Sequence, residues 1–186
     1  SRRQRQMCIR DRERSSVFYN LGLNMALINH PSSSDYFERS IDMALAAADT
    51  ASACHYMRNY ATALANNREY VKSNDLLRRV KRLMPAVGNH VMLQITFAEN
   101  FLNLHQLDSA RYYWNQAWAN EQNHGGDKAE GFSVRSALVQ LKTVLDYTSG
   151  TPLDIITFGR FADSVRVEMR DQNSVTAVSY THLRAH

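Results

Sequence analysis

The sequence is poor in residues that break helices. Seven glycines and three prolines are spread over 186 residues, so long stretches contain neither. Ala, Leu, Arg, Gln and Met are plentiful, and all of them favour the helical backbone. This composition argues against a sheet-rich fold and predicts an all-α chain.

Cysteine is scarce, with Cys8 and Cys54 as the two copies. Because Cys8 lies close to the amino terminus, the interior holds a single thiol and no disulfide framework is expected. A lone thiol fits a reducing cytoplasm or a bacterial periplasm that uses no bridge, so the compartment stays open.

Signals for catalysis and for membrane insertion are also missing. No apolar run approaches the roughly 18 residues of a membrane span, and no glycine-rich phosphate loop, zinc-type cysteine pair or His-Glu-x-x-His motif occurs. The adjacent Cys54 and His55 would point about 100° apart on a helix, so they do not suit a nucleophile and its base. The interior histidines lack metal-ligand spacing; they are His30, His55, His90, His105 and His124. We therefore predict no enzyme, no cofactor and no metal.

The formal net charge of +4 is concentrated at the ends of the chain. Residues 1–12 and 178–186 hold six of the 22 basic residues and one of the 18 acidic residues, which leaves 16 basic and 17 acidic residues between them. Both end segments resemble the peptides produced when sequencing-adapter DNA is translated together with a gene fragment, so they are set aside before the fold is considered. The interior then offers no basic face, and we predict that it binds no nucleic acid.

Apolar residues at three- and four-residue spacing predict about eight helices in four pairs. The expected ranges are 15–29 with 33–48, 50–66 with 69–84, 89–104 with 107–122, and 128–147 with 152–170. Links this short make the helices of a pair antiparallel neighbours. The predicted organisation is a non-native tail at 1–12, three helical hairpins at 13–122, a flexible connection at 123–127, a divergent fourth hairpin at 128–171, and a disordered or non-native tail at 172–186.

The same pattern of small and large residues recurs at an offset of 37 residues. Four pairs of positions obey it: Ala61 with Ala98, Ser73 with Ala110, Leu77 with Trp114, and Val80 with Ala117. Generic amphipathic helices repeat with periods of about 3.6 or 7 residues, so an ordinary helical bundle explains these offsets poorly. The recurrence predicts an array of stacked helix pairs.

Large-small pairs occupy the middle of the first helix of three successive units: Leu21-Gly22, Tyr60-Ala61 and Phe97-Ala98. Ala110, Trp114 and Ala117 supply the small, aromatic and small positions of a second helix. Over about residues 15–122 this pattern resembles the tetratricopeptide repeat family, although the period exceeds the usual value of about 34 residues. The resemblance implies a right-handed superhelical array of antiparallel helix pairs, an α-solenoid.

The resemblance also implies a concave groove lined by the first helix of each unit. Mapped onto this chain, the groove residues are Tyr19, Leu23, His55, Arg58, Thr62, Asn66, Met92, Ile95, Glu99 and Asn103. Arg58 and the amides suit backbone or carboxylate groups, while Met92 and Ile95 offer an adaptable apolar floor.

We therefore predict a non-enzymatic scaffold that binds a peptide or a helix of another protein. The alternative is a sensory or coupling repeat region of a larger bacterial signalling or transcription-regulatory protein.

Overall fold

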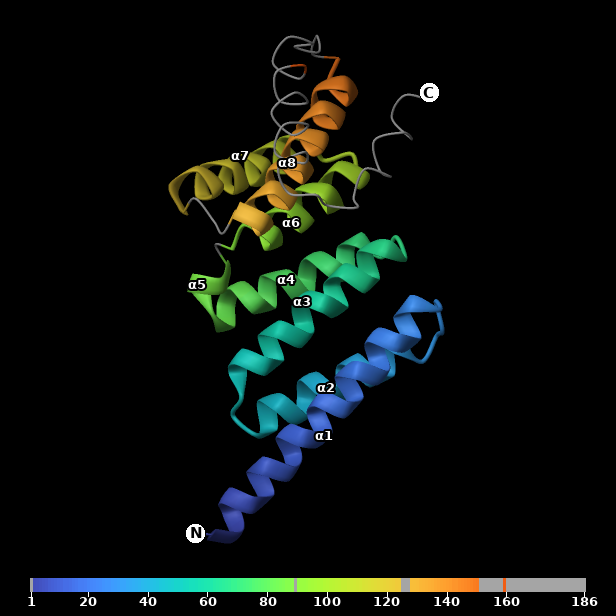
Figure 1. The fold of residues 1–186 in the computed structure, drawn as a ribbon. Helices are drawn as coiled ribbons and strands as arrows, with labels where there is room; N and C mark the ends of the chain where they lie inside the picture. The colour runs from blue at the N-terminus through green and yellow to red at the C-terminus, as the bar shows by residue number, and fades with distance from the viewer. Residues whose placement is uncertain (1, 89, 125–127, 151–158, 160–186) are drawn as a thin grey trace. The chain divides into compact units, whose positions relative to one another are not determined.

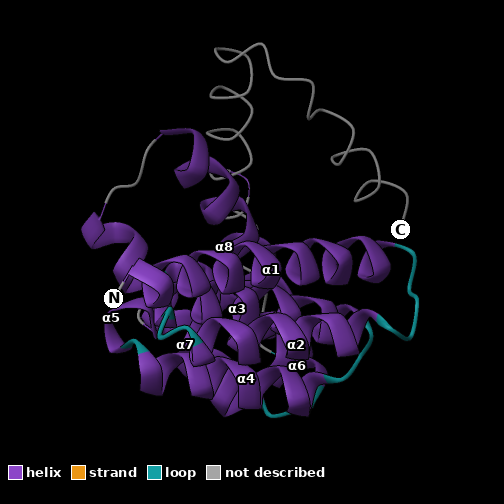
Figure 2. Cartoon of the chain, turned by 90° about the horizontal axis from the view of Figure 1, so that it is seen from below, coloured by secondary structure: helices purple, strands orange, loops and turns teal. Residues whose placement is uncertain are grey.

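The computed structural model describes residues 2–88, 90–124, 128–150 and 159. These residues form eight helices and no strand (Figure 2). The helices are α1 (Arg2–Leu27), α2 (Ser33–Ala46), α3 (Thr50–Asn66), α4 (Tyr70–Leu83), α5 (Pro85–Gly88), α6 (Val91–Asn103), α7 (Leu107–His124) and α8 (Lys128–Thr148). The all-α prediction is confirmed for the described part of the chain.

The chain divides into two compact units, residues 1–124 and residues 125–186. In the first unit α1 packs on α2, α3 packs on α4, and α6 packs on α7 (Figure 1). Successive pairs also touch, because α2 contacts α3 and α4 contacts α6. The first helices of the pairs meet as well, since α1 contacts α3 and α3 contacts α6.

Apart from shifts of up to about two residues at helix ends, the observed helices differ from the predicted ones at α1 and α5. Helix α1 begins at Arg2 rather than at Ser15, because periodicity detects only a packed apolar stripe, whereas Arg and Gln continue a helix without one. Helix α5 was not predicted, and its first residue is Pro85, which suits the first helical position. The predicted helix at 152–170 lies outside the described residues, so the eight helices observed are a different set from the eight predicted.

Four turns between helices end in the left-handed backbone conformation without glycine. The residues with positive φ are Asn29, Ala48, Arg68 and His105. Each turn carries the paired hydrogen bonds of a Schellman motif; after α3, for example, Glu69 N donates to Leu64 O at 2.8 Å and Arg68 N donates to Ala65 O at 2.9 Å. These hydrogen bonds pair backbone carbonyls that would otherwise lack a partner at the helix end. They also hold the turn in which the chain reverses direction within a few residues.

The recurrent positions lie in the interior. All eight residues of the four pairs spaced by 37 are buried. The small members are needed for close approach: a Cβ added to Gly22 would lie 3.1 Å from the ring of Phe37, which is fully buried. The repeat in the sequence is therefore a repeat of close contacts between helices.

A polar group is buried where α4 meets α6. Asn100 is fully buried, and its amide nitrogen donates to Ser73 Oγ at 2.8 Å and to Asn74 Oδ1 at 2.9 Å. The oxygen of the same amide, Asn100 Oδ1, has no hydrogen-bond partner. Because both acceptors lie on α4, the contact favours one register between these two helices.

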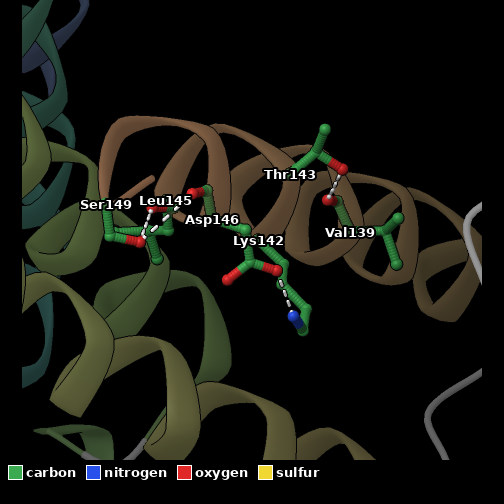
Figure 3. Close-up of polar contacts among 6 residues, drawn as sticks. All are labelled: Val139, Lys142, Thr143, Leu145, Asp146 and Ser149. Carbon is green, nitrogen blue, oxygen red and sulfur yellow. Dashed lines mark hydrogen bonds and ion pairs between the residues drawn. The ribbon is translucent and has the colours of Figure 1, made fainter. Parts of the chain in front are cut away.

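In the second unit α8 is stabilised by contacts along its own length (Figure 3). Lys142 forms an ion pair with Asp146 one turn later, and Thr143 Oγ1 donates to Val139 O at 2.9 Å. At the carboxyl-terminal end Ser149 Oγ donates to Leu145 O at 2.7 Å, which satisfies a terminal carbonyl. The predicted range of 128–147 agrees with α8 to within one residue, and the pairing of this helix into a fourth hairpin stays a prediction.

Candidate functional site

Helices α1 and α3 bring two of the predicted groove residues into contact. Tyr19 Oη lies 3.1 Å from His55 Nε2, and the two rings are 5.3 Å apart. Tyr19 also stacks on Tyr56, with ring centroids 4.4 Å apart and an interplanar angle of 20°. Asn59 completes the group, because its amide nitrogen lies 3.4 Å from His55 Nε2. We refer to Tyr19, His55, Tyr56 and Asn59 as the junction cluster.

The neighbours of His55 favour one of its two tautomers. The amide nitrogen of Asn59 can only donate, and the hydroxyl of Tyr19 can donate or accept, so the pair favours Nε2 as an acceptor and the imidazole proton on Nδ1. Burial, followed by the positive charge of Arg58, lowers the pKa of His55. The lowered pKa favours a neutral imidazole near pH 7.

Cys54 and His55 do not form a reactive pair. Cys54 is 2 % exposed, whereas the side chain of His55 is exposed, so the two residues face different environments. Burial raises the pKa of the Cys54 thiol, and the charges of Arg58 and Arg79 oppose that rise only in part. The thiol therefore stays protonated at neutral pH and packs as a small apolar group.

Several polar side chains on α3 and α6 donate hydrogen bonds to backbone carbonyls of their own helix. Thr62 Oγ1 donates to Arg58 O at 3.2 Å, and Asn59 Nδ2 donates to His55 O at 3.0 Å on α3. On α6, Asn103 Nδ2 donates to Glu99 O at 2.8 Å, and Thr96 Oγ1 donates to the carbonyl of Met92 at 3.0 Å. These bonds use donors and leave the side-chain oxygens available to accept, which keeps the surface able to bind a polar backbone.

The α6 part of the predicted groove is only partly open. Met92 is 41 % exposed, and Glu99 and Asn103 are exposed as well. Loss of solvation raises the pKa of the Glu99 carboxyl even though its side chain reaches the surface. The prediction that Ile95 lines the open groove is wrong, because this side chain is buried and only 2 % exposed. Helix α6 is apolar around most of its circumference and therefore buries residues on several sides.

The remaining predicted residues lie on the first two pairs. Thr62 and Asn66 are exposed on α3, and Leu23 is half-buried on α1.

Two residues of the junction cluster were not predicted. Asn59 could have been found from its position four residues after His55, which places both on one helix face. Tyr56 gives no such signal, because it is buried and its pattern is that of a core residue.

The described residues hold neither a candidate metal site nor a candidate membrane span. No group of three or more His, Cys, Asp and Glu side chains within the described ranges is placed to hold a metal ion. None of the helices described is long and apolar enough to cross a membrane. Comparisons with protein-family models, curated proteins and solved structures find no match to this chain.

Proposed function

We propose that the first unit is a non-enzymatic interaction scaffold, built as a tetratricopeptide-like superhelical array, whose helices α1, α3 and α6 form a groove for a peptide or helix of another protein. The observation that carries the proposal is the contact of these three helices in succession. Positions of α3 and α6 in the proposed groove correspond at the 37-residue offset, as His55 does with Met92 and Thr62 with Glu99.

The chemistry of this surface suits an extended peptide or an amphipathic helix. Exposed hydroxyls and amides on α3 and α6 can pair with a polar backbone, and the exposed thioether of Met92 can adapt to apolar side chains. Arg58 forms no ion pair among the described residues, so its charge is available to a partner. Main-chain hydrogen bonds would give affinity, and the charge would give orientation.

The proposal is tested by selecting binders from a displayed random-peptide library on the full chain. The selected peptides are then measured against a double variant, Arg58→Glu with Met92→Ala, which changes α3 and α6. A matched control, Arg82→Glu with Val71→Ala, makes the same charge reversal and a comparable truncation of an apolar side chain at exposed positions of α4.

We expect the groove variant to lose about tenfold or more in affinity, which corresponds to roughly 1.4 kcal/mol. The control should stay within about twofold of the parent, since residues outside an interface contribute little. If both variants lost the same affinity, or if the groove variant bound the selected peptides as tightly as the parent, the partner would bind elsewhere.

A further inference from the structure

The junction cluster leaves one imidazole donor of His55 unused. Asn59 can only donate to Nε2 and Tyr19 is able to, so the two contacts favour the tautomer with its proton on Nδ1. Nδ1 has no hydrogen-bond partner within the part of the chain that the structure describes, and the side chain is exposed. In the favoured tautomer the cluster presents an N–H donor at the surface of α3.

Arg58 places a positive charge on the same helix, near enough to His55 to lower its pKa. It lies three residues after His55, so the two side chains share one face of α3. The positive charge of Arg58 acts on the imidazole, because it is one of the two causes of the lowered pKa of His55. Acidic residues at the two ends of α3 are engaged elsewhere: Asp49 with Arg12 at 3.3 Å, and Glu69 with Lys72. No acidic side chain of the described residues neutralises Arg58.

We propose that His55 and Arg58 form a two-donor site for a carboxylate side chain, so that the segment bound by this surface is acidic. This inference rests on the proposed function and specifies the chemistry of the partner. A carboxylate can accept from the imidazole N–H and from the guanidinium together, and such charge-assisted hydrogen bonds are stronger than neutral ones. A neutral carbonyl would accept from His55 but would leave the charge of Arg58 uncompensated.

Tyr19 and Asn59 act as positioning residues in this site. They contact the imidazole at Nε2 and so favour the tautomer with its proton on the other nitrogen. Tyr19→Phe removes one donor to Nε2 while keeping the stacked ring. We expect this variant to shift the imidazole nitrogen resonances toward a mixture of tautomers and to weaken binding of an acidic peptide without any change of net charge.

The test uses the full chain and two blocked peptides, one of alternating Glu and Ala and one with Gln in place of each Glu. Binding is followed at low ionic strength by isothermal titration and by long-range proton–nitrogen correlation spectra of the imidazoles. We expect the Glu peptide to move the His55 resonances and to bind about tenfold more tightly than the Gln peptide, a difference of roughly 1.4 kcal/mol. Arg58→Gln and His55→Gln should each remove most of that difference.

Arg82→Gln is the matched control, because it removes the same charge from an exposed position of α4 that also lacks an ion pair among the described residues. If Arg82→Gln weakened the Glu peptide as much as Arg58→Gln does, attraction would be general rather than local and the proposed site would be refuted. Equal affinity for both peptides would overturn the carboxylate site while leaving the groove in place. Failure of the Glu peptide to move the His55 resonances at millimolar concentration would also overturn it.

Discussion

Replacing Ala48 with glycine should stabilise the protein, although glycine usually weakens helical proteins. Ala48 follows α2 and has a φ of 53°, in the left-handed region, and its backbone N–H donates to Leu45 O at 3.0 Å. Its side chain is exposed. The substitution therefore changes backbone strain and little else.

The size of the effect follows from two opposing terms. A residue with a Cβ costs about 1–2 kcal/mol in the left-handed conformation, and glycine removes that cost. Glycine also gains freedom in the unfolded chain, which costs about 0.5–1 kcal/mol. The net stabilisation is about 0.5–1 kcal/mol, and the midpoint of thermal unfolding should rise by about 1–4 °C.

The assay is thermal and urea unfolding followed by circular dichroism. Ala63→Gly is the control, because Ala63 lies within α3, where the same change should destabilise by about 1 kcal/mol. Opposite signs for the two variants would support the assigned turn. If Ala48→Gly destabilised the chain as much as Ala63→Gly does, the turn after α2 would not have the left-handed geometry.

Three further predictions concern packing and charge. Asn100→Ala leaves two buried acceptors on α4 without their donor and should cost about 1–3 kcal/mol in urea unfolding, whereas the exposed Asn103→Ala should stay within about 0.5 kcal/mol; equal effects would contradict the buried network. Gly22→Val pushes methyl groups into the ring of Phe37 and should cost about 1–3 kcal/mol, and an unchanged unfolding midpoint would contradict the close contact. The raised pKa of Glu99 means that the folded state holds its proton more tightly than the unfolded state, so its contribution to stability is present below the unfolded pKa and is lost as pH rises through the folded pKa. Glu99→Gln should therefore flatten the dependence of stability on pH above about pH 4.3, and an unchanged slope would refute the effect of desolvation.

Local signals explain why parts of the fold could be predicted. Helix α3 begins and ends at the predicted residues, and its start is marked by Asp49, whose side chain accepts from Ser52 N at 3.1 Å and caps the first turn. The end of α3 was harder to explain from sequence, since Arg68 takes a conformation that usually indicates glycine. The hydrogen bonds of the turn hold that conformation, and they depend on the helix already being formed.

The candidate site was less predictable because it depends on contacts between helices. Spacing placed Tyr19 and His55 on first helices, but it could not show that the hydroxyl of one meets the imidazole of the other. Ile95 lies at the 37-residue offset from Arg58 and was predicted to line the groove, yet its side chain is buried. Equivalent positions in a repeat therefore need not share the same exposure. The contact of Asn100 with α4 joins residues 26 and 27 positions apart, which no local pattern encodes.

The most direct test of the central claim is the site at which a selected peptide becomes cross-linked. A photoreactive amino acid is placed at Thr62, which is exposed on α3, or at Val71, which is exposed on α4. A partner bound along α1, α3 and α6 predicts efficient cross-linking from position 62 and little from position 71. Cross-linking that is stronger from position 71, or equal from both, would contradict the groove on the first helices.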